Sequence, residues 1–367
     1  MIIDNTALTV ADVQNQLQGS LALCDAQLLL DMGRVSLRVR SNSAELIKIL
    51  SRYFKASIQQ GQCSKEVLEV RAIECPAPSL DVEYQEWQRE AGKIGRKDSY
   101  SDIEGGRIIR KVRTGMVFLQ SKNLCLAAGP CIAYNNQVIN FINTQYITYL
   151  QQRGWLICHA AALSKNQRGL ALAGLSGGGK SSLMLHLLDN KQWNYLTNDR
   201  LLIDKKDDTV CAAGIPKLPR INPGTIVNNP RLHALLSCEQ HEQFSAMSKE
   251  ELWLHEEKYD VNIEQHYGEN RLSTEAELAA FVVLNWQFAP GDGTQLTQID
   301  LRQRPDLLQA IMKSPGPFHQ KLDGSFNSQD PGFNNIAYLE MLSSTPVYEI
   351  TGDRNFTEAC TLIEQLF

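Results

Sequence analysis

The chain has 367 residues, 43% of them hydrophobic and 21% charged, with a net charge of −5 at pH 7. This length allows two domains, while the mixed charge and the absence of any apolar run near about 18 residues predict no nucleic-acid or membrane partner. Residues 1–30 lack a basic signal-peptide start, and nine scattered cysteines without a Cys-x-x-Cys pair indicate neither a zinc cluster nor a disulfide framework, so a cytoplasmic location is expected.

The first part of the chain is predicted to be an α+β module covering residues 1–130. Apolar alternation in 21–40 predicts a hairpin or meander, and 44–54 has the spacing of a helix capped by serines. Further strands are expected at 67–72 and over 107–120. The polar stretch 79–105 is interpreted as a solvated connection or an exposed helix.

The second part, residues 131–367, is predicted to be an α/β domain. A helix is expected over 137–152 and a strand over 155–160. A short apolar strand at 169–173 then leads through a glycine-rich loop into a helix marked by leucines over 183–188. Strand, glycine loop and helix, in that order, are the context in which a phosphate-binding loop is found.

The loop itself matches the pattern of a glycine, four residues and Gly-Lys-Ser. Glycines let backbone N–H groups approach a polyphosphate directly, the lysine supplies charge to the β- and γ-phosphates, and the serine hydroxyl can bind Mg²⁺. The sequence therefore predicts that the chain binds ATP and Mg²⁺. The residues expected to bind them are Gly174, Ser176, Gly177, Gly178, Gly179, Lys180, Ser181 and Ser182.

The next predicted strand, 193–197, ends in Asn198-Asp199, where a carboxylate could serve as a second metal ligand beside Ser181. A hairpin is expected over 200–213. Three prolines then stiffen residues 215–224, which present Lys217 and Arg220 either as an ordinary loop or as a clamp for substrate or phosphate.

The remaining elements are predicted more simply. Residues 228–258 have a helical pattern and 281–286 the pattern of a buried strand. Residues 287–334 are expected to form loops around one or two short helices. A strand at 347–350 and a helix over 355–366 complete the chain.

Four features in order resemble HPr kinase/phosphorylase and its kinase-B-type relatives: His159-Ala160, the glycine loop, Asn198-Asp199, and the run from Glu256 to Asp260. The resemblance covers about residues 155–290. It implies a core related to phosphoenolpyruvate carboxykinase, phosphate transfer from a nucleotide to a serine hydroxyl, and a possible homo-oligomer. It also implies catalytic roles for His159, Lys180 and Asp199, and substrate contacts by Glu257 and Arg271.

One position departs from that family, which has two adjacent acids where this chain has Asn198-Asp199. The first acid is the implied base, and an amide cannot accept the hydroxyl proton. Either Asp199 serves as base and metal ligand together, or the base is His159 or Glu257. Phosphorylase activity, which reverses the same proton transfer, is not expected.

Three functions follow as hypotheses. The first is a Mg-ATP-dependent kinase that acts on a protein or peptide serine or on a small-molecule hydroxyl. The second is an ATP-binding regulatory or assembly protein with weak catalysis. The third, a GTPase switch, is disfavoured because the chain has no Asn-Lys-x-Asp sequence to recognise guanine.

Overall fold

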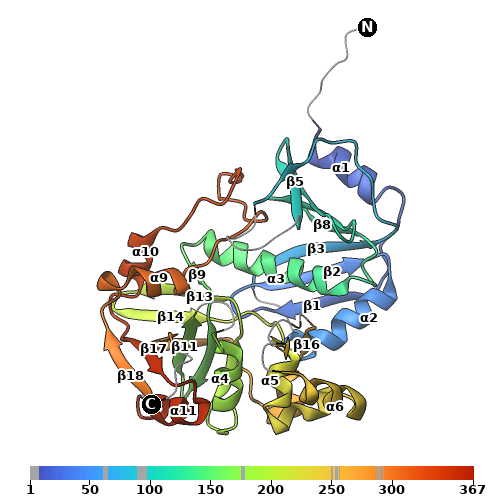
Figure 1. Ribbon diagram of the computed structural model, residues 1–367. Helices are drawn as coiled ribbons and strands as arrows, with labels where there is room; N and C mark the ends of the chain where they lie inside the picture. Colours follow the sequence, from blue (N-terminus) through green and yellow to red (C-terminus); the bar gives the residue numbers. More distant parts are fainter. Residues whose placement is uncertain are drawn as a thin grey trace. The chain divides into compact units, whose positions relative to one another are not determined.

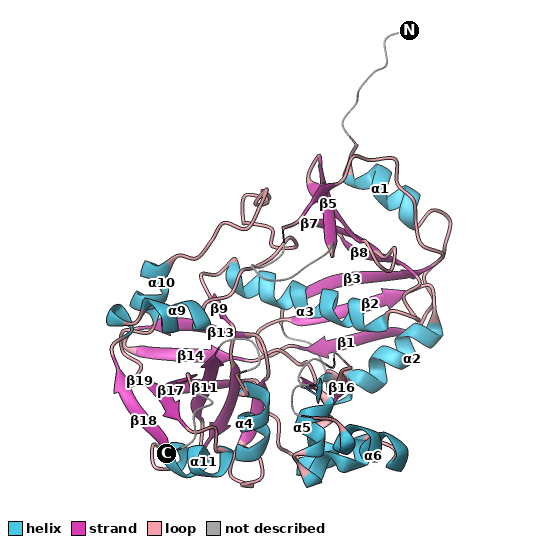
Figure 2. Ribbon diagram, viewed as in Figure 1, coloured by secondary structure: helices cyan, strands magenta, loops and turns pink. Residues whose placement is uncertain are grey.

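The computed structural model describes residues 8–60, 65–88, 97–174, 178–248, 251–252, 255, 257–286, 291 and 293–367. Its contacts divide the chain into two compact units. Unit 1 comprises Met1–Gly154 and Ser314–Gly332, and unit 2 comprises Trp155–Lys313 and Phe333–Phe367. The division after Gly154, rather than after residue 130, groups the helix over 135–151 with unit 1. Both units combine helices and sheets (Figures 1 and 2).

Unit 1 contains an eight-stranded sheet in the order β1-β2-β3-β8-β7-β6-β5-β4. Strands β2, β3 and β8 are parallel neighbours, and the other neighbours are antiparallel. The strands are β1 (Gln27–Asp31), β2 (Ser36–Ser41), β3 (Val67–Glu74), β4 (Gln85–Glu86), β5 (Asp98–Ile103), β6 (Gly106–Lys111), β7 (Val117–Ser121) and β8 (Cys125–Gly129). The described helices are α1 (Val10–Leu17), α2 (Ala44–Tyr53), η1 (Lys55–Ser57) and α3 (Asn135–Gln151).

Helices cover both faces of this sheet, because successive side chains along its strands point to opposite faces and are apolar on both. Along β7, Val117 packs in the cluster that includes Val13 of α1. The next residue, Phe118, points to the opposite face and meets Phe141 of α3 with 5.0 Å between ring centroids. Consecutive strand residues point to opposite faces, so β7 is buried on both sides, and α2 contacts α3 on the second face.

Only part of the polar stretch 79–105 departs from the solvated connection or exposed helix that its composition suggested, and residues 89–96 of it lie outside the described residues. Residues 98–103 form β5, in which Tyr100 is only 2% exposed. Asp98 is largely buried as well, and its carboxylate pairs with Lys111 Nζ at 2.5 Å. Pairing of the charged groups lets a polar sequence occupy a buried strand.

A late segment of the chain, Ser314–Gly332, belongs to unit 1. Phe318 packs edge-on against Phe118 with 5.5 Å between centroids. Arg107, whose side chain is buried, lies with its guanidinium carbon 4.6 Å from the centre of the Phe326 ring. Aromatic and cation–π contacts of this kind hold the segment on the sheet.

Unit 2 is built on a nine-stranded sheet in the order β12-β10-β11-β17-β14-β13-β9, with β19 on the edge of β17 and β18 beyond it. Strand β17 is parallel to β11 and β19, and the remaining pairs are antiparallel. The strands are β9 (Leu156–Cys158), β10 (Ala161–Lys165), β11 (Arg168–Gly174), β12 (Asn194–Thr197), β13 (Leu201–Lys206), β14 (Thr209–Ala213), β17 (Glu275–Leu284), β18 (Thr294–Ile299) and β19 (Val347–Gly352).

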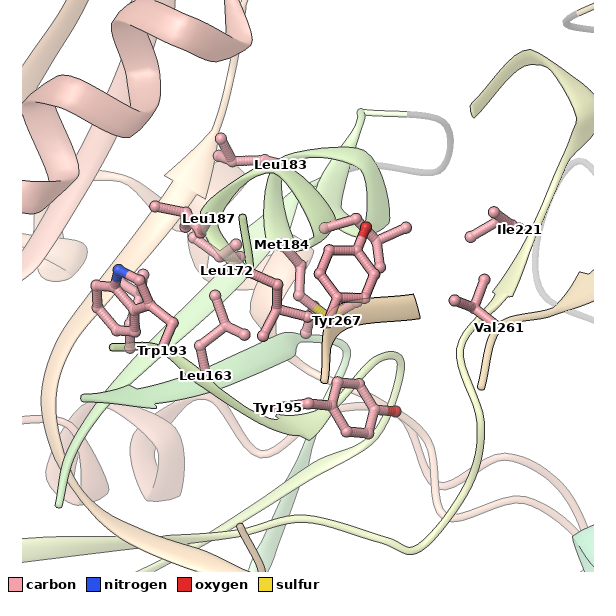
Figure 3. Packing of buried hydrophobic residues seen from close by; sticks show 14 of the residues in the cluster. Leu163, Leu172, Leu183, Met184, Leu187, Trp193, Tyr195, Ile221, Val261 and Tyr267 are labelled. Carbon is pink, nitrogen blue, oxygen red and sulfur yellow. The ribbon is translucent and has the colours of Figure 1, made fainter. Parts of the chain in front are cut away.

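Helices cover both faces of the unit 2 sheet. Leu170 and Leu172 of β11 join the core beneath α4 and α11, whereas Ala171 and Ala173 face the core beneath α9 and α10. Figure 3 shows the first core, where leucines of β10 and β11 lie against α4. The described helices of the unit are α4 (Lys180–Leu187), α5 (Pro223–Val227), η2 (Pro230–Leu235), α6 (Cys238–Ala246), α8 (Ile263–Tyr267), η3 (Leu301–Gln303), α9 (Pro305–Ile311), α10 (Asn335–Met341) and α11 (Phe356–Glu364).

Short strands β15 (Arg220–Ile221) and β16 (Tyr259–Asp260) pair beside the helices of residues 223–267. Across the described parts of both units, no helix combines the length and apolar character needed to cross a membrane.

Candidate functional site

The glycine-rich loop lies between a central strand and a helix. Strand β11 ends at Gly174 and α4 begins at Lys180, while Leu175, Ser176 and Gly177 lie outside the described residues. Gly179 has φ +87°, and a Cβ there would lie 3.1 Å from the ring of Phe356. A residue with a side chain would therefore be strained at Gly179 by its backbone and crowded by its neighbour.

The Lys180 side chain connects the two ends of the glycine-rich loop. It is 9% exposed, and its Nζ donates a hydrogen bond to the Gly174 carbonyl at 2.8 Å. Burial lowers the pKa of Lys180 to about 8, an effect that the nearby charge of Asp199 opposes and that of Lys313 reinforces. The loop lysine therefore lies in the electrostatic neighbourhood of Asp199.

Two aromatic residues, Trp286 and Phe356, contact the end of the loop at Gly178 and Gly179, and the sequence patterns did not identify either as a site residue. Trp286, just after β17, donates from Nε1 to the Gly178 carbonyl at 2.6 Å. Phe356, the first residue of α11, meets Trp286 edge-on with 5.5 Å between centroids and stacks on His186 of α4. These contacts tie the loop to two elements that lie far away in the sequence.

His159 and Asp199 meet because β9 and β13 are antiparallel neighbours. Leu201 pairs with Cys158, so the residue that follows Cys158 lies beside the residues that lead into β13. His159 Nε2 lies 3.2 Å from Asp199 Oδ1. The backbone N–H of His159 also donates to the Ile311 carbonyl at 2.7 Å, which fixes the backbone that carries the imidazole.

Two cations stand at the second oxygen of Asp199. Lys313 Nζ lies 3.8 Å and Arg200 Nε 3.9 Å from Asp199 Oδ2. Lys313 follows α9 directly after Met312, which forms a β-bridge with Cys158. No local motif marks Lys313, because this bridge between distant parts of the chain is what brings it to the site.

The pKa values of both members of the pair are lowered, for different reasons. Burial acts to raise the pKa of Asp199, but the hydrogen bond from His159 and the charge of Lys313 hold it well below its usual range. For His159, the hydrogen bond to Asp199 raises the pKa, while burial and the charges of Lys313 and Lys180 outweigh it. At neutral pH the pair is thus a carboxylate beside a neutral imidazole. Because 49% of the Asp199 side-chain surface is exposed, solvent screens these interactions.

The side-chain oxygens of Ser181, Asn198 and Asp199 are of the type that Mg²⁺ prefers as ligands. Among the described residues no group of three or more His, Cys, Asp or Glu side chains could hold a metal ion. A nucleotide-bound Mg²⁺ needs only one or two protein oxygen ligands besides phosphate and water. Asn198 Oδ1 is buried without a hydrogen-bond partner, next to the ionised Asp199, and Ser181 lies in the first turn of α4. An acceptor without a donor in this position suits a hard cation.

The proline-rich segment lies against the strand that leads to Asp199. A Cβ added to Gly214 would be only 2.0 Å from the Leu196 carbonyl oxygen, so the segment crosses directly over β12. The Tyr195 hydroxyl donates to the Lys217 carbonyl at 2.6 Å. Farther on, Arg220 is held in the β15–β16 pair. The structure thus places the start of the proline-rich segment against β12.

Glu257 and Arg271, for which the family resemblance implies substrate contacts, do not contact the groups around Asp199 through any described hydrogen bond or ion pair. Glu257 contacts His255 and Tyr259, and no described hydrogen bond or ion pair links it to the groups around Asp199. Glu256 lies outside the described residues.

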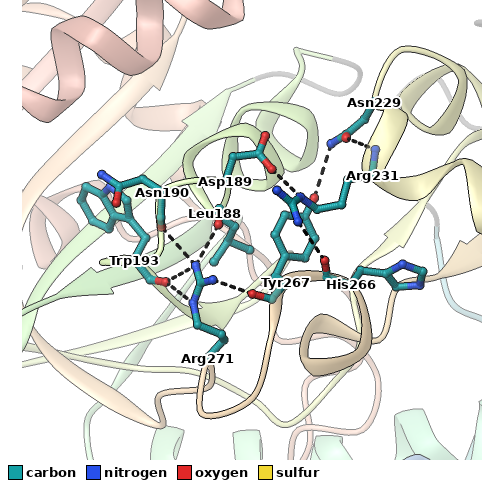
Figure 4. A network of polar contacts seen from close by, with 9 residues as sticks. All are labelled: Leu188, Asp189, Asn190, Trp193, Asn229, Arg231, His266, Tyr267 and Arg271. Atoms are coloured by element: carbon teal, nitrogen blue, oxygen red, sulfur yellow. Dashed lines mark hydrogen bonds and ion pairs between the residues drawn. The ribbon is translucent and has the colours of Figure 1, made fainter.

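Arg271 is a buried structural residue at the far end of α4 from the loop, as Figure 4 shows. Its guanidinium donates to the backbone carbonyls of Leu188, Asn190, Trp193 and Tyr267 at 2.6–3.1 Å. The substrate contact that the family resemblance implies for Arg271 does not match this placement. The position of a basic residue near a strand gave no sign that its donors would be taken up by the end of a helix.

No protein-family model matches the chain, and no curated protein sequence matches it. Among solved structures, the Hpr(Ser) kinase/phosphatase from Coxiella burnetii is similar to it at 11% sequence identity and a TM-score of 0.30. That similarity covers 57% of this chain and 88% of the other.

Proposed function

We propose that the chain is a Mg-ATP-dependent phosphotransferase that moves the γ-phosphate of ATP to a hydroxyl group. The observation that carries the proposal is that one electrostatic neighbourhood contains the loop lysine and the His159–Asp199 pair, because the charges of Asp199 and Lys313 both act on Lys180. Phosphoryl transfer depends mainly on positioning and on neutralising charge. A lysine at the phosphates and a proton acceptor nearby supply these two needs.

The loop would bind the polyphosphate and the groups around Asp199 would hold the metal ion. In this role Lys180 gives up its bond to the Gly174 carbonyl for the β- and γ-phosphates. Ser181, Asp199 and the unpartnered Asn198 oxygen would hold Mg²⁺, which neutralises charge on the phosphates when bound.

The His159–Asp199 pair would receive the proton of the acceptor. A new bond forms between the acceptor oxygen and the γ-phosphorus, the bond from the γ-phosphorus to the β–γ bridging oxygen breaks, and ADP leaves with that electron pair. The hydroxyl proton passes to His159, which Asp199 orients, or to Asp199 itself. This replaces the acid that the family resemblance implies at position 198. Glu257, the third candidate from the sequence, has no described tie to the pair.

A second candidate function is an ATP-binding regulatory protein with weak catalysis. The specific observation in its favour is Asn198, an amide at the position where an acid is implied. The two functions agree on nucleotide binding at Lys180 and differ on whether phosphate moves.

The test combines nucleotide binding and phosphate transfer. ATP affinity is measured by calorimetry, and transfer of label from [γ-³²P]ATP is followed in host-cell lysate, for the wild type, Lys180→Ala and Asp199→Ala. Lys206→Ala, at an exposed lysine in the β13–β14 hairpin, serves as the control. We expect label in one protein band or one small metabolite with the wild type and the control only. Lys180-dependent binding without any transfer would favour the regulatory protein, and no ATP binding would overturn both functions.

A further inference from the structure

Three cationic side chains gather at the end of β12 beyond the pair of His159 and Asp199. Arg200 follows Asp199 directly, and its carbonyl accepts a hydrogen bond from Thr197 at 3.0 Å. Lys217 lies on the proline-rich segment that Tyr195 holds against β12. Arg220 follows three residues later in β15, where it is paired with β16. We call Arg200, Lys217 and Arg220 the basic cluster.

The charges in this region do not balance. Among the described groups that act on Lys217, the cations Arg200 and Arg220 face the two carboxylates of Asp199 and Asp260. The proposed nucleotide and its metal ion would engage Asp199. Asp260 is then the remaining described carboxylate near three cations, and like charges held together in a partly buried site repel one another.

The guanidinium groups of the cluster also have unused donors. The Nε atoms of Arg200 and Arg220 are buried and have no hydrogen-bond partner. Asp260 Oδ1 lies 3.0 Å from Arg220 Nε, and Asp199 Oδ2 lies 3.9 Å from Arg200 Nε, yet neither contact is a hydrogen bond. A buried donor without an acceptor is unfavourable, and a charged one more so. An oxyanion would satisfy both donors and relieve the repulsion.

We propose that the acceptor of the phosphoryl group is a small molecule that carries an oxyanion, either a phosphate or a carboxylate, close to its hydroxyl, and that the basic cluster binds this oxyanion. The inference rests on the proposed kinase function and adds the chemical class of its second substrate. Guanidinium groups match phosphate and carboxylate geometry, and a lysine adds a point charge. Since Arg200 Nε lies 3.9 Å from Asp199 Oδ2, the oxyanion would lie within a few bonds of the reacting hydroxyl.

This arrangement would select against neutral alcohols. A neutral acceptor would leave the buried Nε–H groups of Arg200 and Arg220 unsatisfied, and unsatisfied donors in a binding site discriminate strongly against ligands that lack the matching acceptor. The stiff backbone imposed by Pro216 and Pro219 would keep Lys217 in place, so that little ordering is needed when the anion binds.

The test measures anion binding separately from nucleotide binding. The full chain is loaded with Mg²⁺ and the non-hydrolysable analogue AMP-PNP, which occupies the γ-phosphate position. Sulfate, a probe for phosphate, and acetate, a probe for carboxylate, are then titrated by calorimetry. We expect one of the two to bind, and Lys217→Met and Arg220→Gln each to weaken it by about tenfold, the loss of one charge-assisted hydrogen bond.

Two further variants protect this test against misfolding. Asp260→Asn removes a competing carboxylate and should tighten anion binding, a gain that damage to the fold would not produce. Arg231→Gln removes an exposed arginine that pairs with Asp189 at 2.7 Å, outside the basic cluster, and should leave the affinity unchanged.

The outcomes separate the two proposals. Stronger binding of sulfate assigns a phosphate to the acceptor, and stronger binding of acetate assigns a carboxylate. No binding of either anion, or equal weakening by Arg231→Gln, overturns the inference while AMP-PNP binding still stands. If AMP-PNP does not bind, the proposed kinase function fails. Sulfate and acetate are then titrated into the nucleotide-free Lys180→Ala variant. Because this variant lacks the loop lysine, the titration shows whether the basic cluster binds an anion independently of the loop lysine.

Discussion

The two oxygens of the Asp199 carboxylate face groups of different kinds. Oδ1 lies 3.2 Å from His159 Nε2, and Oδ2 lies 3.8 Å from Lys313 Nζ. Asp199 therefore joins an imidazole that can accept a proton to a fixed cation, within the electrostatic range of the loop lysine. The arrangement depends on two pairings of β9, one with β13 and one with Met312.

The first prediction concerns the pKa of His159 in metal-free protein. Asp199→Asn should lower this pKa further, because the hydrogen bond and the negative charge of Asp199 both raise it. Lys313→Met should raise it, because the positive charge of Lys313 lowers it. Histidine ¹H–¹⁵N spectra recorded across a pH titration measure both changes.

The control for this titration is Lys206→Met, which removes an exposed lysine from the β13–β14 hairpin and should leave the pKa of His159 unchanged. Opposite shifts in the two test variants cannot arise from a general loss of structure. If the pKa of His159 is the same in Asp199→Asn and in the wild type, the two side chains are not in contact and the proposed proton acceptor is wrong.

The second prediction concerns stability. Arg271→Met should lower the free energy of unfolding by about 3–5 kcal/mol, because it leaves several buried carbonyls at the end of α4 without their donors. ATP affinity of the folded variant should change little, since Arg271 does not reach the loop. Urea denaturation followed by tryptophan fluorescence measures the loss, because Trp193 accepts two of the hydrogen bonds.

Arg231→Gln provides the comparison for Arg271→Met. Arg231 lies in the same network of Figure 4, but its side chain is 45% exposed and pairs with Asp189 at the surface. Exposed pairs contribute about 0–1 kcal/mol. A large loss of ATP affinity with normal stability in Arg271→Met would return Arg271 to the substrate site that the family resemblance implied.

Local patterns in the sequence predicted the elements around the loop. The apolar run at 169–173 corresponds to β11, and the hairpin expected over 200–213 corresponds to β13 and β14. These elements have strong local signals, because their side chains are buried against the sheet. Strand β18 (Thr294–Ile299) gave no such signal, since it lies at the sheet edge and its residues are mostly polar. It was included in a stretch expected to form loops.

The contents of the candidate site were predicted only in part. His159 and Asp199 stand next to strands that the sequence made visible, so their positions could be proposed from the motif order. Lys313 and Trp286 could not, because each reaches the site through pairing or packing with a distant part of the chain. Arg271 was expected to contact the substrate but lies elsewhere, since residue type alone does not reveal that a side chain is buried among carbonyls.

The third prediction is that anion binding by the basic cluster weakens as the pH rises through about 8. Burial, with the charges of Arg200 and Arg220, lowers the pKa of Lys217 to about 8, against the opposing effects of Asp199 and Asp260. Lysine is cationic below its pKa, so the anion loses this charge above about pH 8.

The same depressed pKa affects stability in the opposite sense. Between the folded pKa and the ordinary value of 10.5, the unfolded chain holds a proton at Lys217 that the folded chain has lost. The contribution of this group to stability therefore increases with pH across that window.

Sulfate titrations of AMP-PNP-loaded protein from about pH 6.5 to 9.5 test the effect of pH on anion binding. The Lys217→Met variant should remove the step near pH 8, and a step that persists in this variant would contradict the assignment to Lys217.

The last prediction concerns the contact between Gly214, at the start of the proline-rich segment, and β12. In Gly214→Ala the new methyl group would lie 2.0 Å from the Leu196 carbonyl oxygen, so the segment must move away from β12. We expect about 1–3 kcal/mol of destabilisation from the overpacking. We also expect a sulfate affinity about tenfold weaker, because Lys217 and Arg220 shift although every charge is retained.

Gly224→Ala is the matched control for Gly214→Ala. It adds the same methyl group in α5, where the nearest described atom, the Leu252 Cβ, would be 3.7 Å away, an ordinary contact. Gly224→Ala should therefore bind sulfate and AMP-PNP like the wild type. If Gly214→Ala also binds sulfate normally while its melting temperature falls, the contact with β12 stabilises the unit but does not position the basic cluster. If only its sulfate affinity falls and AMP-PNP binding is kept, the contact at Leu196 is what positions Lys217 and Arg220 in the basic cluster.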